Sequence, residues 1–391
     1  MNSSSPILPP STIGIIGGGQ LGMMTIREAQ RMGYRTIVWD PDPACPASRL
    51  ADKTITAPYT DAKASAAMAT KADVITYEFE NINAATVTTL EQTKIVRPGS
   101  SILKISQHRR REKLELRRHG FPTAPFTFAT NVPELESAIT EIGLPVVVKT
   151  ATSGYDGKGQ SVLRTNSDVE NFFGTLGSPG EYVVEKFVML QCELSVIVAR
   201  SLNGNAVSFP VAENEHRENI LHVSIIPARI SERLRKESEK LARSIADTLS
   251  VVGILCVEMF VTIEGALLVN ELAPRPHNSG HYTLDACSIS QFEALVRTVC
   301  GLPVAPPALL TSCAMVNILG KHMSRLDIPA LLEIEGIKLH LYGKTIVQPK
   351  RKMGHVTILG TTPREVEQRM AKVHRLLEES MTLHSPINIE G

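Results

Sequence analysis

The first third of the 391-residue chain alternates short apolar runs with amphipathic segments. The run TIGIIGG (12–18) predicts a buried strand, and LGMMTIREAQRMG (21–33) predicts a helix with one apolar face. Later apolar runs predict three more strands, at RTIVWD (35–40), ADVITYE (72–78) and KIVRP (94–98). Such alternation is typical of a parallel sheet with helices on both faces. We therefore expect an α/β, Rossmann-like domain over residues 13–115, after an N-terminal extension of residues 1–12.

The remainder of the chain is richer in β patterns. Strands are predicted at LPVVVKT (144–150), YVVEKFV (182–188) and CELSVIVAR (192–200). A long helix is expected over 231–253, closed by Gly253, and the two apolar runs of 254–275 predict a hairpin turning at Glu264 and Gly265. The Pro-rich GFPTAPF (120–126) suits a domain boundary.

Three short apolar runs and a final helix near 363–380 end the chain; the runs are AMVNILG (314–320), KLHLYGK (338–344) and MGHVTILG (353–360). We expect an α+β domain over 116–309, with a lid over about 120–195, and a small, mostly β domain over 310–391. The whole chain is thus predicted to combine α/β and α+β architecture.

Composition narrows the class of protein. Forty-one basic against 40 acidic residues give a net charge of +1, which argues against bulk attraction to nucleic acid or to an acidic membrane. The basic helix expected around Ser106–His119 is interpreted as a solvated face rather than a polyanion site. Six scattered cysteines favour free thiols, and the first dozen residues lack the pattern of a signal peptide. Together with the absence of a long apolar run, this predicts a cytoplasmic protein.

A glycine-rich turn follows the first predicted strand. Gly17, Gly19 and Gly22 fit the G-x-G-x-x-G pattern, and Asp40 ends the next strand. Taken alone, this fingerprint predicts a dinucleotide site, so an NAD(P)-dependent oxidoreductase is one alternative. The N–H groups that begin the following helix suit a phosphate of any kind.

A second set of residues suits a nucleoside triphosphate. Lys149 ends a strand and precedes the loop SGYDGKGQSVL (153–163), whose backbone N–H groups could hold phosphates beside the lysine. A plain hairpin loop remains the alternative. Glu258 and Glu271 interrupt two adjacent apolar strands, with Asn270 beside one of them. Such oxygen ligands suit Mg²⁺, the alternative being carboxylates paired with an arginine such as Arg275.

His277 and His281 have a spacing that a helix could use to bind zinc. Pro276 and Gly280 predict an irregular loop instead, and no third soft ligand is evident. We therefore expect no zinc site.

These motifs resemble the ATP-grasp ligases. Within that group, GGGQLGMM (17–24), SGYDGKGQ (153–160), NELAPRPHNSGHYT (270–283), SISQFE (288–293) and RKMGHV (351–356) are similar to the carboxyaminoimidazole ribonucleotide synthetases of purine biosynthesis. The likeness extends from about residue 13 to 360. It implies an ATP-grasp fold whose Rossmann-like first domain does not bind NAD.

The resemblance implies an ATP site between two β layers, with Glu185 accepting from the adenine amino group and Glu193 binding the ribose. The residues implied around ATP are Arg109, Lys149, Gly154, Tyr155, Asp156, Gly157, Lys158, Gly159, Gln160, Glu185, Lys186, Phe187, Val188, Glu193, His216 and Asn270. Glu258 and Glu271 are the implied Mg²⁺ ligands. In QHRRREK (107–113) the choice of Arg109 over its neighbours stays open.

The second implied substrate is 5-aminoimidazole ribonucleotide. The residues expected to bind it are Gly19, Gln20, Leu21, Glu78, Lys344, Arg351 and Lys352, with Glu80 competing for the role of Glu78. Arg275, His277, Asn278 and Ser279 would line the space between ATP and the amine. Tyr155 and Asp156 could orient that amine and take its proton.

The implied reaction is carboxylation of that amine by bicarbonate, through carboxyphosphate formed with ATP. The alternatives are another ATP-grasp ligase, of the formate-dependent glycinamide ribonucleotide or biotin carboxylase type, and the oxidoreductase named above. The implied partners are small molecules and a second copy of the chain, since the family is commonly dimeric. In some eukaryotes the synthetase is fused to the mutase of the next step.

Overall fold

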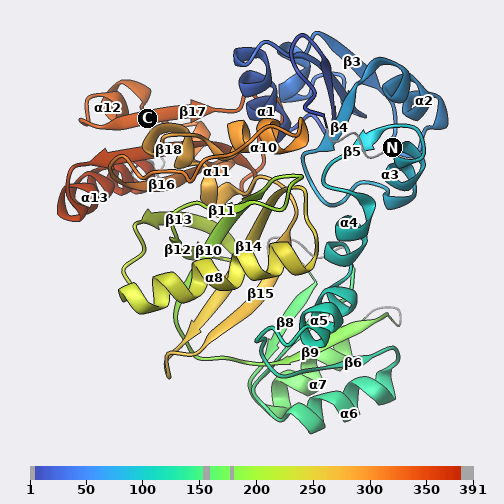
Figure 1. Cartoon of the computed structure of the whole chain (residues 1–391). Coiled ribbons are helices and arrows are strands. Elements are labelled where there is room, and N and C mark those ends of the chain that lie inside the picture. Colours follow the sequence, from blue (N-terminus) through green and yellow to red (C-terminus); the bar gives the residue numbers. More distant parts are fainter. Residues whose placement is uncertain (1–4, 153–158, 177–179, 380–391) are drawn as a thin grey trace, which may run out of the picture.

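The first domain is a five-stranded parallel sheet. The computed structural model describes residues 5–152, 159–176 and 180–379 (Figure 1). In the order β3-β2-β1-β4-β5, the strands are Lys53–Thr56, Arg35–Asp40, Thr12–Ile16, Val74–Tyr77 and Ile95–Val96. The helices are α1 Gln20–Arg31, α2 Ala62–Lys71, α3 Ala84–Glu91, α4 Ser100–Ser106 and α5 Arg109–Arg118.

Alternation along β1 sends side chains to two separate cores. Ile13 and Ile15 pack with the buried face of α1, whereas Ile16 packs with residues of α2 and α3. Both faces of the sheet are therefore covered, and the predicted α/β arrangement is confirmed. The sequence pattern did not predict the short β3, which is largely exposed.

A second, antiparallel sheet lies at the far end of the molecule, at the bottom of Figure 1. In the order β6-β9-β7-β8 its strands are Phe126–Ala129, Tyr182–Lys186, Val146–Thr150 and Gln160–Leu163. Helices α6 (Val132–Ile142) and α7 (Asn166–Thr175) pack on it. The side chains of Asn131 and Thr165 accept N–H bonds at the starts of these helices, which fixes where each helix begins.

The largest sheet has nine strands and connects the middle of the chain to its C-terminal part. Eight form the path β15-β14-β10-β12-β13-β16-β18-β17, and β11 pairs with β10. In chain order, β10 to β18 are Leu190–Arg200, Ala206–Ser208, Ala212–Arg217, Ile220–Ile226, Gly253–Thr262, Leu267–Ala273, Ser312–Leu319, Ile337–Leu341 and Lys352–Gly360. Its helices are α8 Glu232–Thr248, α9 Thr283–Ala286, α10 Gln291–Val299, α11 Gly320–Met323, α12 Ile328–Leu332 and α13 Pro363–Glu379.

Two details of this sheet bear on the sequence predictions. The hairpin of β14 and β15 turns at Glu264 and Gly265 as expected, with Gly265 at φ +81°. Gly253 does not close α8, which ends at Thr248. It begins β14 at φ +135°, where an added Cβ would lie 2.9 Å from the Pro98 ring. The glycine is needed for that close approach. No helix among the described residues is long and apolar enough to cross a bilayer.

Candidate active site

The three sheets border one cavity of about 940 Å³. Most residues predicted to bind substrates or metal line it: Gln20, Leu21, Glu78, Arg109, Lys149, Gln160, Glu185, Lys186, Phe187, Val188, Glu193, His216, Glu258, Asn270, Glu271, Arg275, His277, Asn278 and Lys352. Glu80, Asn219 and Phe260, which were not chosen as site residues, line it too. Gly154, Tyr155, Asp156, Gly157 and Lys158 lie outside the described residues.

The predicted ATP side centres on Glu185 of β9. Its Oε1 lies 3.0 Å from Lys149 Nζ, and its Oε2 lies 3.3 Å from Lys113 Nζ. Burial alone would raise the pKa of Glu185, but Lys149 and then Lys113 outweigh it and lower the pKa to about 2. Glu185 is therefore a buried carboxylate held between two ammonium groups. Sequence reasoning did not single out Lys113.

Helix α5 presents two different faces. Arg111, Arg117 and Arg118 are exposed, as the predicted solvated face requires. Glu112 and Lys113, however, are each only 2% exposed, so that interpretation is wrong for the inner face. The available signal was the spacing to Leu116, because Glu112 and Lys113 lie four and three residues before it and so share its inward face.

The inner face of α5 is bound to strands on both sides. Arg109 Nη1 donates to the Thr150 carbonyl at 3.0 Å, and the Arg109 N–H donates to Ala151. Glu112 Oε2 accepts the Leu272 N–H at 3.1 Å. The helix therefore fixes the strand ends that carry Lys149 and Glu271.

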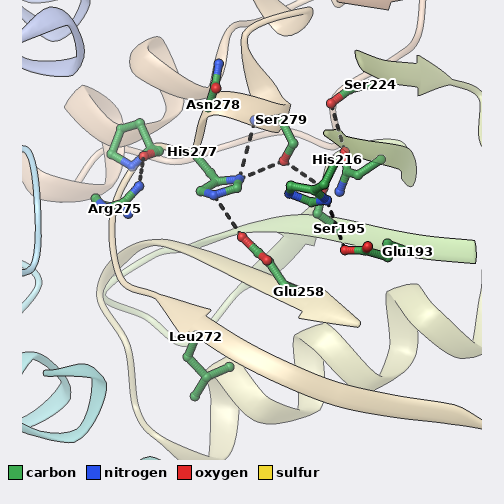
Figure 2. Close-up of polar contacts among 12 residues, drawn as sticks. Glu193, Ser195, His216, Ser224, Glu258, Leu272, Arg275, His277, Asn278 and Ser279 are labelled. Atoms are coloured by element: carbon green, nitrogen blue, oxygen red, sulfur yellow. Dashed lines mark hydrogen bonds and ion pairs between the residues drawn. The ribbon is translucent and has the colours of Figure 1, made fainter. Parts of the chain in front are cut away.

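Glu258 and Glu271 are direct cross-strand partners on β14 and β15. Glu258 Oε1 lies 2.9 Å from His277 Nε2, and His277 Nδ1 lies 2.8 Å from Ser279 Oγ (Figure 2). Burial works to raise the pKa of Glu258, yet the His277 charge and hydrogen bond hold it at about 2. Burial and the charge of Glu258 instead raise the pKa of Glu271.

This acid pair fits a divalent cation. Two carboxylates side by side repel each other when both are ionised, and a cation between them removes that cost. Asn270 adds an amide oxygen on the same strand, and Lys149 Nζ lies 3.4 Å from it. His277 contacts only Glu258, and the pKa of Glu271 stays raised although Arg109 and Lys149 act to lower it, so the positive charge within the protein does not fully balance the pair.

Glu193 and His216 form a second pair beside these acids. His216 Nδ1 lies 3.0 Å from Glu193 Oε2, and Figure 2 shows the two side chains next to each other. Burial lowers the pKa of His216, but the Glu193 carboxylate raises it above its ordinary value. An imidazole whose charged form is favoured in this way suits the neighbourhood of phosphates.

The glycine turn is filled by a side chain of the protein. Glu78, after β4, accepts the Gly19 N–H at 2.7 Å and the Gly22 N–H at 2.6 Å. A Cβ on Gly19 would lie 2.6 Å from Glu78 Oε1, so only glycine admits this carboxylate. The backbone donors that a dinucleotide pyrophosphate would use are thus engaged by Glu78.

Asp40 does not present a free carboxylate for a ribose either. One oxygen accepts the Gly18 N–H at 2.7 Å and the Tyr59 hydroxyl at 2.8 Å, and the other accepts the Asp42 N–H. Asp40, the acid that completes the dinucleotide fingerprint, therefore stabilises the turn by accepting a hydrogen bond from its backbone. This geometry disfavours the oxidoreductase alternative.

Glu80 and Arg275 are paired across the cavity. Arg275 Nη2 donates to Glu80 Oε1 at 2.9 Å, and its Nε contacts the second oxygen. Glu80 is thus engaged by arginine, whereas Glu78 faces the glycine turn, so the two candidates have different surroundings. Glu80 raises the pKa of Arg275, and Arg275 helps lower that of Glu80 despite its burial.

Asn278 is held by a residue that sequence reasoning missed. Its amide exchanges two hydrogen bonds with Asn317 of β16, at 3.1 and 2.8 Å, and Asn317 also donates to the Leu221 carbonyl. The signal was present, because Asn317 interrupts the otherwise apolar run of β16. The C-terminal part of the chain therefore orients the loop that carries His277.

His277 and His281 point to different partners. His281 is fully buried, contacts Gln291, and packs against the His355 ring, whereas His277 faces Glu258. Residues Asn278–Gly280 form a short 3₁₀ turn rather than an α-helix. Within the described ranges no group of three or more His, Cys, Asp or Glu side chains is arranged to hold a metal.

Two predicted acceptor residues, Lys344 and Arg351, do not line the cavity themselves but lie close to Lys352, which does. Lys344 Nζ donates to the Lys352 carbonyl at 2.8 Å and lies over the Tyr342 ring. Arg351 donates to the Ile346 carbonyl at 2.9 Å. Burial and the nearby Arg351 charge lower the pKa of Lys344 to about 8. Gly19 and Gly159 also lie outside the residues that line the cavity.

Comparison with known proteins agrees with this geometry. The ATP-grasp domain family matches residues 114–292, the ribonucleotide synthetase preATP-grasp domain matches 11–107, and the phosphoribosylaminoimidazole carboxylase C-terminal domain matches 313–369. The N5-carboxyaminoimidazole ribonucleotide synthase of Bacillus subtilis is 46% identical over 358 residues, which are 91% of this chain and 93% of that protein. The chain belongs to the N5-carboxyaminoimidazole ribonucleotide synthase family.

Solved structures of this synthase family superpose closely. A crystal structure of an ADP complex of an N5-carboxyaminoimidazole ribonucleotide synthetase has a TM-score of 0.91 at 45% identity, covering 96% of this chain and 98% of that one. The Aspergillus clavatus enzyme in complex with ADP and 5-aminoimidazole ribonucleotide has a TM-score of 0.88 at 27% identity, covering 94% and 99%. The ATP-grasp fold expected from the sequence is confirmed.

Membership of the synthase family decides between the alternatives. The protein is an ATP-dependent carbon–nitrogen ligase, and this reading is favoured over the other ATP-grasp ligases and over an oxidoreductase. All six cysteines are free thiols, as predicted. The roles of individual residues remain predictions.

Proposed function

We propose that this cavity carries out the synthase reaction on ATP, bicarbonate and 5-aminoimidazole ribonucleotide. ATP binds between β7 and β9 on one side and the β10–β15 region on the other. Arg109 and Lys149 contact its phosphates, while Glu185 and the segment 185–188 contact adenine. The observation that carries the proposal is that most residues of each predicted ligand set line one cavity.

Mg²⁺ is held by Glu258 and Glu271 in this proposal. Their cross-strand pairing and the raised pKa of Glu271 support a cation between them. The metal supplies charge neutralisation between the ATP phosphates during phosphoryl transfer. His277 keeps the Glu258 carboxylate ionised and fixes its direction.

The acceptor binds on the opposite side, toward the first domain. Lys344, Arg351 and Lys352 attract its phosphate together with the first turn of α1, at Gln20 and Leu21. Glu78 already accepts the Gly19 and Gly22 N–H groups, so it is positioned to meet the ribose next to that phosphate. Arg275, His277 and Asn278 then line the path from the phosphoryl group to the amine.

The chemistry proceeds in two steps. Bicarbonate oxygen takes the γ-phosphoryl group of ATP, giving ADP and carboxyphosphate. The amine nitrogen then bonds to the carboxyl carbon as phosphate leaves, and the amine loses a proton. Cations around both anionic reactants and exclusion of water favour this sequence. Tyr155 and Asp156 are proposed to orient the amine and take its proton.

A phosphate-release assay tests the proposal. With Mg²⁺ present, release should require ATP, bicarbonate and 5-aminoimidazole ribonucleotide, and omission of any one should reduce it to background. Glycinamide ribonucleotide with formate is the discriminating substitute. Turnover with that pair and none with the imidazole would transfer the protein to another ATP-grasp activity.

We also infer a cytoplasmic homodimer that hands its product to a mutase. The free cysteines support a reducing compartment. The link to a second enzyme is supported by a Dictyostelium discoideum relative that is named a bifunctional purine synthesis protein. It is 39% identical over 381 residues, and the match covers 38% of its length. Sedimentation of the purified chain tests the dimer, and a monomer at micromolar concentration would contradict it.

A further inference from the structure

Lys113 is a buried cation that has no role in the proposed reaction. Its side chain is 2% exposed, and Nζ has no hydrogen bond of good geometry among the described residues. It is not one of the residues lining the cavity, although its partner Glu185 is. Burying an ammonium group costs free energy unless an opposite charge is paired with it.

Lys113 forms an ion pair with Glu185, which it shares with Lys149, and its charge also acts on the neighbouring buried Glu112. Lys113 lies 3.3 Å from one carboxylate oxygen, and Lys149 lies 3.0 Å from the other. Glu185 therefore has two cationic partners, one on each carboxylate oxygen, and keeps one of them if the other moves away. Of the two lysines, only Lys149 lines the cavity and can turn toward a phosphate.

We propose that Lys113 is a positioning residue that stays paired with the Glu185 carboxylate while Lys149 turns toward the triphosphate. The inference rests on the proposed ATP site. With Lys113 present, Glu185 keeps a partner after Lys149 leaves it. Without Lys113, Lys149 is the sole counter-charge of a buried carboxylate, so ATP must compete with Glu185 for it.

Helix α5 fixes Lys113 firmly enough for this role. The helix is attached to β7 through Arg109 and to β15 through Glu112. Arg109 and Lys113 are four residues apart, so they share a helix face. Helix α5 therefore supplies Arg109, a cation on the phosphate side, and Lys113, which allows Lys149 to leave Glu185.

A double-mutant cycle with Lys113→Met and Glu185→Gln tests the inference, with ATP affinity measured by calorimetry and the two Michaelis constants by steady-state kinetics. Lys113→Met should weaken ATP binding about tenfold and leave the Michaelis constant for 5-aminoimidazole ribonucleotide unchanged. Lys113→Arg should recover most of the loss. In a Glu185→Gln background, Lys113→Met should have little further effect, because the amide needs no counter-charge.

The matched control is Arg111→Met, which removes a cation from the exposed face of the same helix and should leave ATP affinity unchanged. An equal loss from Lys113→Met in both backgrounds would overturn the inference, since it would indicate a direct effect on ATP. If Lys113→Met does not fold, Lys113→Gln replaces it in both backgrounds, because the comparison needs the same change with and without the Glu185 carboxylate. Normal ATP affinity in Lys149→Met would instead contradict the proposed ATP site itself.

Discussion

The glycine turn of the first domain and the β14–β15 hairpin both bring carboxylates to the cavity, but the carboxylates have different partners in the two places. At the turn, Glu78 receives two backbone N–H groups. On the hairpin, Glu258 and Glu271 face each other, and His277 contacts only Glu258. The turn supplies the anion that its own donors need, whereas the hairpin lacks part of the positive charge that its acids need.

This difference explains why the more familiar motif is the less informative one. The glycine pattern suits any anion, and here the protein's own Glu78 fills it. The hairpin has no named pattern, yet an unbalanced pair of buried acids points to a cation. Local charge balance therefore indicates the missing ligand better than the motif does.

The largest expected effect comes from the hairpin. Glu258→Gln or Glu271→Gln should slow turnover by about two orders of magnitude or more, because each change removes a charge from the proposed Mg²⁺ site. Turnover at saturating Mg²⁺ and thermal melting are measured together. Glu264→Gln, at the exposed turn of the same hairpin, is the control and should behave as wild type. Near-normal turnover in either test variant would make its acid structural.

A smaller effect is expected from the acceptor side. Lys344→Ala or Arg351→Ala removes a charge-assisted contact of roughly 1.5–3 kcal/mol, about a ten- to hundredfold rise in the Michaelis constant for 5-aminoimidazole ribonucleotide. The constant for ATP should change little. Replacement of Gly19 by a larger residue should show the same selectivity, because its side chain would displace Glu78. Lys350→Ala is the control, since Lys350 is exposed and pairs with Glu218. Equal losses for both substrates would contradict this assignment.

The turn itself should reveal a pH dependence. Burial, opposed by the two backbone hydrogen bonds, raises the pKa of Glu78 to about 7. The folded protein therefore binds more protons than the unfolded chain between about pH 4.5 and 7, and stability falls as pH rises through that window. Glu78→Gln should flatten this dependence by about 1–3 kcal/mol. Denaturant unfolding at several pH values measures it, and an unchanged slope would contradict the raised pKa.

The smallest effect is expected from added NAD, measured as a shift in melting temperature. Millimolar ATP with Mg²⁺ should raise the melting temperature, because a ligand that binds only the folded state stabilises it. NAD at the same concentration should leave it unchanged, since Glu78 and Asp40 engage the turn's donors. A clear shift with NAD, lost on replacement of Gly19, would show that the turn still binds dinucleotides.

Much of the fold followed from periodicity, but the buried charges did not. Apart from the short, exposed β3, the strands of the first sheet and the hairpin were predicted because their apolar runs are continuous. Lys113 was assigned to a solvated face because its neighbours Arg110 and Arg111 are basic. A run of like charges does not reveal which side chain has its partner on a distant strand, and Glu185 is 72 positions away.

The same reason applies to the two asparagines. Asn278 was predicted to be near the substrates from its motif, but its partner Asn317 became visible only once β13 and β16 were paired. Likewise, the pattern of 254–275 indicated two acids on adjacent strands. Only the register made Glu258 and Glu271 direct partners.

The pairing of β13 with β16 has a consequence for how the chain can be divided. Val223 and Ile225 of β13 pack in the same core as Val316 of β16 and Val373 of α13. A truncation before residue 312 would expose a long apolar edge strand with unpaired backbone groups. Such a fragment should aggregate, although Glu258 and Glu271 would both be present in it. The C-terminal strands thus complete the nine-stranded sheet. We expect the middle and C-terminal parts of the chain to unfold together in one cooperative transition.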